Sequence, residues 1–135
     1  MTVPTFLQTM RAIGGFLDRA AAHCVETGAS PDDFVTERLY PDMAPFHFQI
    51  EAAWHHSAWA VEALLTGQFD PPKLEWEVPF ARLRAMIAEG EEQLMAFTRE
   101  EVDSCAGKAL DMQSGPACWT GPLLGPISRG WAATR

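Results

Sequence analysis

The chain has 135 residues, 47% of them hydrophobic and 21% charged, which suits one globular domain and excludes wholesale disorder. Its formal net charge of −8 argues against a nucleic-acid partner, because phosphate binding requires a basic face. No stretch approaches the ~20 apolar residues that cross a membrane. No secretory signal opens the chain, and its three cysteines show no C-x-x-C spacing. We therefore expect a reduced, cytoplasmic protein with neither a membrane nor a nucleic-acid partner.

The first 40 residues predict a long helix followed by a short one. The long helix covers about residues 4–27, and its core-facing stripe repeats at spacings of three and four: Phe6, Met10, Ile13, Leu17, Ala20 and Cys24. Gly14-Gly15 weakens this helix in the middle, which the close approach of another helix would explain. The short helix has Ser30 as its N-cap and Asp32-Asp33 as first-turn charges, which favours capping over a catalytic role for these carboxylates.

Two more long helices follow. The second begins near Asp42 or Pro45 and ends at Leu65, with a predicted core stripe of Phe46, Ile50, Ala53, Ser57, Ala60, Val61 and Leu64. Residues 68–79 read as a linker held extended by two adjacent prolines. The third helix follows Pro79, with a stripe of Phe80, Leu83, Ile87, Gly90, Leu94 and Phe97. After it, Thr98 and Glu101 match a capping box for one more short turn.

The character of the chain changes after Cys105. Residues 106–135 are dense in glycine and proline and carry no helical stripe. We therefore predict a helical domain over residues 1–105 and an irregular tail over residues 106–135. Three long amphipathic helices remain, whereas a closed up-down bundle more commonly has four.

Adjacent histidines in "AWHHSAW" raise the question of a metal site on the second helix. On a wheel of 100° per residue, His55 falls opposite the core beside Glu51, its natural partner four residues earlier, so we expect it at the surface. His56 falls at one edge of the core stripe and His47 at the other. A two-histidine site on one helix requires spacings of three or four residues, which this helix lacks.

A metal at His56 would therefore need ligands from other helices. His23, at the margin of the first helix, is a candidate, and His47 is a further one. The simpler interpretation, which we favour, is a boundary histidine bonded to water or to backbone. Trp54 and Trp59 form either a ligand wall or a subunit contact. Aromatic packing at the core edge suffices for Trp54, whereas Trp59 points outward on the wheel and suggests an interface.

A family resemblance covers about residues 5–125. The most distinctive stretch is "LYPDMAP", followed by the helix "FHFQIEAAWHHSAWAVEALLTG"; "FLQTMRAIGGFLDRAAAHC", "FARLRAMIAEGEEQLMAF" and "MQSGPACWTGPLLG" fit the same pattern in order. Together they resemble DUF1993, an uncharacterised bacterial family that looks like a branch of the DinB/YfiT-like four-helix bundles. The resemblance implies an all-α, DinB-like up-down bundle, here with three long helices and an irregular Gly/Pro-rich tail.

The resemblance also implies what a site would need. Metal-binding DinB-like proteins hold a divalent metal such as zinc, nickel or iron with one histidine on the second helix and two on the fourth. Here only His56, or less well His47, matches a ligand position, and the chain reads "PISRGWAATR" where a histidine-bearing helix would follow. We therefore hypothesise that the fourth helix is missing, by truncation or a shifted frame.

Three functions stay open at this point. The first is non-catalytic binding or homodimerisation through the open face of the bundle, which an absent fourth helix would leave apolar. The second is a DinB-type metal-dependent transferase or hydrolase that uses His56. The third is a small-ligand module that uses the region of Trp54 and Trp59.

Overall fold

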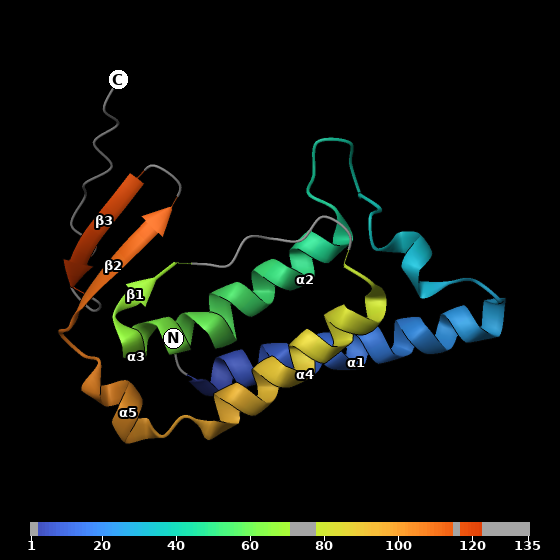
Figure 1. Cartoon of the computed structure of the whole chain (residues 1–135). Coiled ribbons are helices and arrows are strands. Elements are labelled where there is room, and N and C mark those ends of the chain that lie inside the picture. The colour runs from blue at the N-terminus through green and yellow to red at the C-terminus, as the bar shows by residue number, and fades with distance from the viewer. Residues whose placement is uncertain (1–2, 71–77, 115–116, 123–135) are drawn as a thin grey trace.

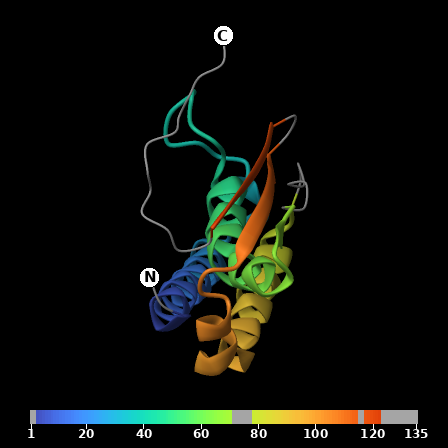
Figure 2. The same ribbon diagram turned by 90° about the vertical axis from the view of Figure 1, so that its left-hand side faces the viewer.

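A computed structural model describes residues 3–70, 78–114 and 117–122 of the chain. Three long helices pack together: α1 (Val3–Thr27), α4 (Phe80–Ala96) and a second helix assembled from α2 (Phe46–Trp54), η2 (His55–Trp59) and α3 (Ala60–Thr66). Figure 1 shows α1 and α4 side by side, with α2 and α3 crossing them, and Figure 2 views the same group from one end. The prediction of a bundle with three long helices is confirmed.

The core lies where the three helices meet. Its fully buried large side chains are Met10, Leu17, Leu83, Ile87 and Leu94 of α1 and α4 together with Val78 just before α4, and the second helix adds Ile50, Ala58 and Val61. Along α1 and α4 the predicted stripes are confirmed, because their members are buried or pack against this core. The α1–α4 contact also has ion pairs on its solvent side, Arg11 with Glu91 at 2.7 Å and Arg84 with Asp18.

Two short helices begin with capping boxes, of which the one at Thr98 was predicted as such and the one at Ser30 only as an N-cap. In η1 (Pro31–Phe34) the side chain of Ser30 accepts from backbone N–H groups, and Asp33 bonds back to the N–H of Ser30. In α5 (Arg99–Ser104) Thr98 and Glu101 do the same. Asp32 has a further role that the sequence did not indicate. Its carboxylate accepts from the N–H of Phe80 at 2.8 Å and so caps the start of α4.

The tail requires a correction. Residues 109–122 were expected to be irregular, but β2 (Ala109–Ser114) and β3 (Ala117–Pro122) pair antiparallel, and β1 (Gln68–Phe69) joins β2 in parallel. Gly67 makes this junction possible at the end of α3, since it adopts φ +76 and its carbonyl accepts from the N–H of Asp111 at 3.0 Å. The sheet lies at one end of the helices in Figure 1.

Some predictions fall beyond the described residues. The two adjacent prolines of the linker, within residues 71–77, and the last part of the tail, residues 123–135, lie outside them. Among the helices that are described, none is both long enough and apolar enough to cross a membrane.

Candidate functional site

His47 and Glu51 form a buried pair on α2. Nδ1 of His47 lies 2.8 Å from Oε1 of Glu51, and only 5% and 4% of the two side chains are exposed. The backbone N–H of His47 bonds to the carbonyl of Val35, which pins the preceding loop on this turn. Glu51 was expected at the surface as the partner of His55, and both parts of that expectation are wrong: Glu51 is buried, and its hydrogen-bond partner is His47.

His55 is also buried, contrary to the prediction that it is solvated. It lies at the start of η2, a π-helical turn, where its ring is 5.1 Å from that of Trp54 and 6.1 Å from that of Trp59. Removal from water lowers the pKa of His55; the charge of Glu51 acts in the opposite direction, and that of His56 adds to the lowering. His55 is therefore held neutral between two tryptophans.

The π-turn changes the pitch of the second helix within its length. A π-helix closes hydrogen bonds over five residues instead of four, so the side chains beyond the turn rotate relative to those before it. The hydroxyl of Ser57 donates to the carbonyls of Ala53 and Trp54 and so satisfies carbonyls within this turn. A wheel of fixed pitch therefore cannot describe the whole helix, but the turn does not account for Glu51, which precedes it and lies on the same buried face as His55.

The two tryptophans are packed within the chain. Trp59 is half-buried and meets Phe69 of β1 with ring centroids 4.7 Å apart, so part of its surface is covered within the chain, and its role in an interface or a ligand wall stays a prediction. Trp54 lies at the core edge, as predicted, directly over α4: a Cβ at Gly90 would be only 2.7 Å from its Cδ1 atom. Nε1 of Trp54 is buried there without a hydrogen-bond partner in the described structure. Gly90, rather than Gly14 or Gly15, is thus the glycine that close helix packing requires.

The three histidines named as metal candidates are dispersed. His47 is bonded to Glu51, whereas His56 on η2 and His23 on α1 are exposed. Within residues 3–70, 78–114 and 117–122, no group of three histidine, cysteine or carboxylate side chains could hold a metal ion. The described residues therefore do not fit the three-histidine site of metal-binding DinB-like proteins, and ligation by His56 stays a prediction.

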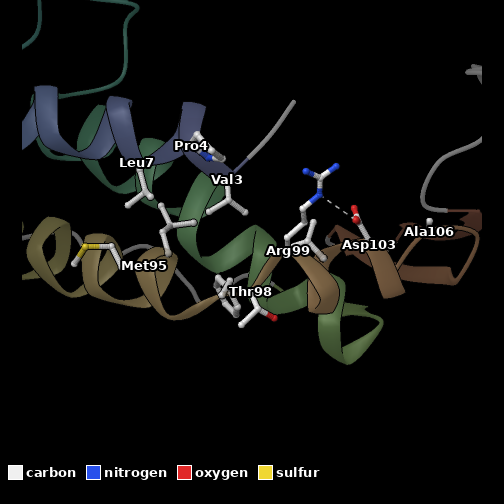
Figure 3. A pocket seen from close by; sticks show the side chains of 11 residues that line it. Val3, Pro4, Leu7, Met95, Thr98, Arg99, Asp103 and Ala106 are labelled. Carbon is white, nitrogen blue, oxygen red and sulfur yellow. Dashed lines mark hydrogen bonds and ion pairs between the residues drawn. The ribbon is translucent and has the colours of Figure 1, made fainter.

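A cleft opens near the N-terminus, at the end of the helices where α5 and the sheet also lie (Figure 1 and Figure 3). Its volume is about 690 Å³, within the range of small-molecule sites. Three segments line it, namely the start of α1 with Val3, Pro4 and Leu7, the end of α4 with Leu94, Met95 and Phe97, and the α5 region with Thr98, Arg99, Val102, Asp103 and Ala106.

The walls of the cleft are apolar, and its charges belong to α5. Val3, Leu7, Phe97 and Val102 pack against the hydrophobic core, so the cleft continues the core toward solvent. The hydroxyl of Thr98 is already engaged with Glu101 in the capping box. Arg99 and Asp103 form an exposed pair, with Nε of Arg99 at 3.4 Å from the carboxylate. Such a cleft can take up an apolar molecule, but it shows no nucleophile–base pair.

Sequence reasoning missed both the buried pair and the cleft. For the pair a signal existed, since His47 and Glu51 stand four residues apart, the spacing at which helical side chains meet. For the cleft the sequence predicted the capped turn of α5 but not where that turn packs. Its position against α1 depends on contacts between residues about 95 positions apart, which periodicity does not report.

Comparison with known proteins gives a family and no activity. The sequence model of the family described as a domain of unknown function, DUF1993, matches residues 1–120. This range includes the three long helices, α5 and the cleft. No curated protein and no solved structure matches the chain significantly.

Proposed function

The chain belongs to the DUF1993 family, whose function is unknown, and from the geometry of its cleft we propose that it binds a small apolar molecule there without catalysing a reaction. The observation that carries this proposal is the apolar lining, supplied by three separate helical segments and continuous with the core. Apolar clefts of this size with a few polar groups are typical of ligand sites. The residues found to line it include no histidine and no cysteine, which favours binding over chemistry.

A neutral fluorescent probe, N-phenyl-1-naphthylamine, tests this proposal. We expect saturable binding of one probe per chain, with displacement by decanol. Leu7→Trp enlarges a side chain that points into the cleft (Figure 3) and should weaken probe binding at least tenfold. Val25→Trp is the control, because it introduces a tryptophan at an 83% exposed residue of α1 that is not among those found to line the cleft, and it should leave binding unchanged.

Urea unfolding of both variants separates a blocked cleft from a damaged fold, and Val3→Trp offers a second blocking change at the first turn of α1. Absence of saturable binding to the unaltered chain would overturn the proposal. Equal binding by Leu7→Trp, Val3→Trp and the control would place the probe elsewhere and overturn it as well.

Homodimerisation is a second candidate function, favoured by exposed large apolar side chains. Leu39 and Tyr40, in the loop before α2, are 86% and 67% exposed, and Phe16, Met43 and Phe48 are also exposed. Such groups are typical of contacts with a second copy. We expect sedimentation equilibrium to show a dimer that Leu39→Ser combined with Tyr40→Ser dissociates. A monomer at every concentration tested would contradict this candidate.

A further inference from the structure

Arg99 stands at the mouth of the cleft, and only one of its five N–H donors, the one on Nε, is engaged within the described residues. Its Nε atom faces Asp103 at 3.4 Å, and 89% of its side chain is exposed. Figure 3 shows the two terminal nitrogens turned away from Asp103, on the side of the cleft where Val3 and Pro4 lie. Neither terminal nitrogen has a partner among the described residues. The two parallel N–H groups of a guanidinium match a carboxylate in a bidentate pair.

The apolar lining and this cation lie within one cleft. Val3, Leu7 and Val102 provide apolar surface, while Arg99 is the one cationic residue found among those lining the cleft. We infer that the ligand of the cleft is an amphipathic carboxylate, whose hydrocarbon chain lies between α1, α4 and α5 and whose head group binds the terminal nitrogens of Arg99. This inference rests on the proposed binding function and adds the chemical class of the ligand.

Asp103 does not block this arrangement. It pairs with the Nε side of the guanidinium, one helical turn further along α5, and leaves the terminal nitrogens free for a ligand at the mouth of the cleft. A ligand carboxylate at the terminal nitrogens therefore adds to the existing pair and does not need to displace Asp103. A cationic ligand would instead have to compete with Arg99 for that carboxylate.

Displacement of N-phenyl-1-naphthylamine from the full chain by three ten-carbon compounds tests the inference: decanoate, decanol and decylamine, all at neutral pH. In the unaltered chain decanoate should bind, and Arg99→Gln should weaken it about three- to tenfold, a modest loss because the guanidinium is exposed. Decanol should stay within twofold in the same variant. Added salt should weaken decanoate and not decanol.

Arg82→Gln is the matched control. It removes the same charge from an exposed arginine of α4 that pairs with Glu89 and does not line the cleft, and it should change no affinity. If Arg99→Gln weakens decanoate and decanol equally, or neither, the carboxylate inference fails while the binding function stands. If decylamine binds best and Asp103→Asn abolishes its preference, the ligand is a cation and the inference is overturned. If no compound binds, the proposed function itself fails.

Discussion

At the scale of single residues, His47 and Glu51 are a buried pair in which each side chain is the other's hydrogen-bond partner. Replacing one partner leaves the other buried without a hydrogen bond. Replacing both leaves no buried polar group that needs a partner. We predict that Glu51→Leu lowers the free energy of unfolding by about 1–3 kcal/mol. The double variant His47→Leu/Glu51→Leu should recover most of this loss. Urea unfolding of the unaltered chain, the two single variants and the double variant measures the coupling between the two side chains. Losses of unfolding free energy that simply add in the double variant would contradict this prediction.

His55 makes stability depend on pH in a defined direction. Burial lowers its pKa in the folded chain, so the unfolded chain binds a proton more tightly. The stability is intact above the ordinary histidine pKa and declines as pH falls from there through the lowered value. We predict that His55→Gln flattens this acid decline, measured as urea midpoints from neutral pH downward. His23→Gln, an exposed histidine on α1, should leave the decline as it is; a decline unchanged in both would show that His55 does not contribute.

The face on which each histidine lies could be predicted from sequence only as far as the helix keeps one pitch. The wheel placed Trp54 correctly at the core edge, next to Gly90. It misplaced Glu51 and His55 because it was phased on apolar residues and so did not expect a glutamate and a histidine in the interior. The π-turn adds a change in rotation per residue that no residue type announces. The spacing of four residues allows Glu51 to pair with His47. It equally allows a pair with His55, so spacing alone does not predict which histidine bonds to the carboxylate.

At the scale of elements, the packing of the second helix on α4 depends on the absence of a side chain at Gly90. A Cβ at Gly90 would lie 2.7 Å from Cδ1 and 3.1 Å from Nε1 of Trp54, too close for a ring held against the core. A Cβ at Gly15 would meet nothing closer than the flexible end of Arg19 at 3.8 Å. The two glycines therefore predict opposite effects of the same substitution.

We predict that Gly90→Ala destabilises the chain by about 1–3 kcal/mol, because overpacking outweighs the gain in helix propensity. Gly15→Ala should stabilise it by up to about 1 kcal/mol, since only the propensity gain applies. Thermal and urea unfolding of both variants give the signs. A stabilising Gly90→Ala would mean that Trp54 can move away from α4 at little cost.

The capping box of α5 links a local structure to the cleft. The backbone N–H of Thr98 and its hydroxyl both bond to Glu101, at 2.8 and 2.9 Å, and they lower the pKa of that carboxyl. The cap therefore contributes above the ordinary glutamate pKa and is lost as pH falls through the lowered value.

We predict that Thr98→Ala speeds hydrogen exchange of the α5 amides about fivefold and weakens probe binding in the cleft. Thr66→Ala, at the end of α3, changes a threonine outside the cleft and should leave both measurements unaltered. Unchanged exchange in Thr98→Ala would show that packing alone holds α5 in place.

At the scale of the whole molecule, the sequence predicted the elements better than their contacts. The bounds of α1 and α4, the N-cap Ser30 and the capping box at Thr98 followed from stripes and caps. The bond from Asp32 to the start of α4 spans 48 positions, and the pairing of β1 with β2 spans more than 40. The paired strands were read as irregular because glycine and proline dominate that segment. Long-range contacts of this kind leave no periodic signal in one sequence.

The metal content of the chain tests whether it binds a metal as metal-binding DinB-like bundles do. A divalent metal held by histidines needs three or four convergent ligands, and in the described part of the chain no three candidate side chains converge. We therefore expect freshly purified, untagged protein to carry much less than one zinc, nickel or iron atom per chain. His56→Ala should not change that content. Near-stoichiometric metal that His56→Ala removes would make this exposed histidine a ligand, completed by residues outside the described ranges or by a second chain. Such a result would also shift the search for function from the cleft near α5 to η2.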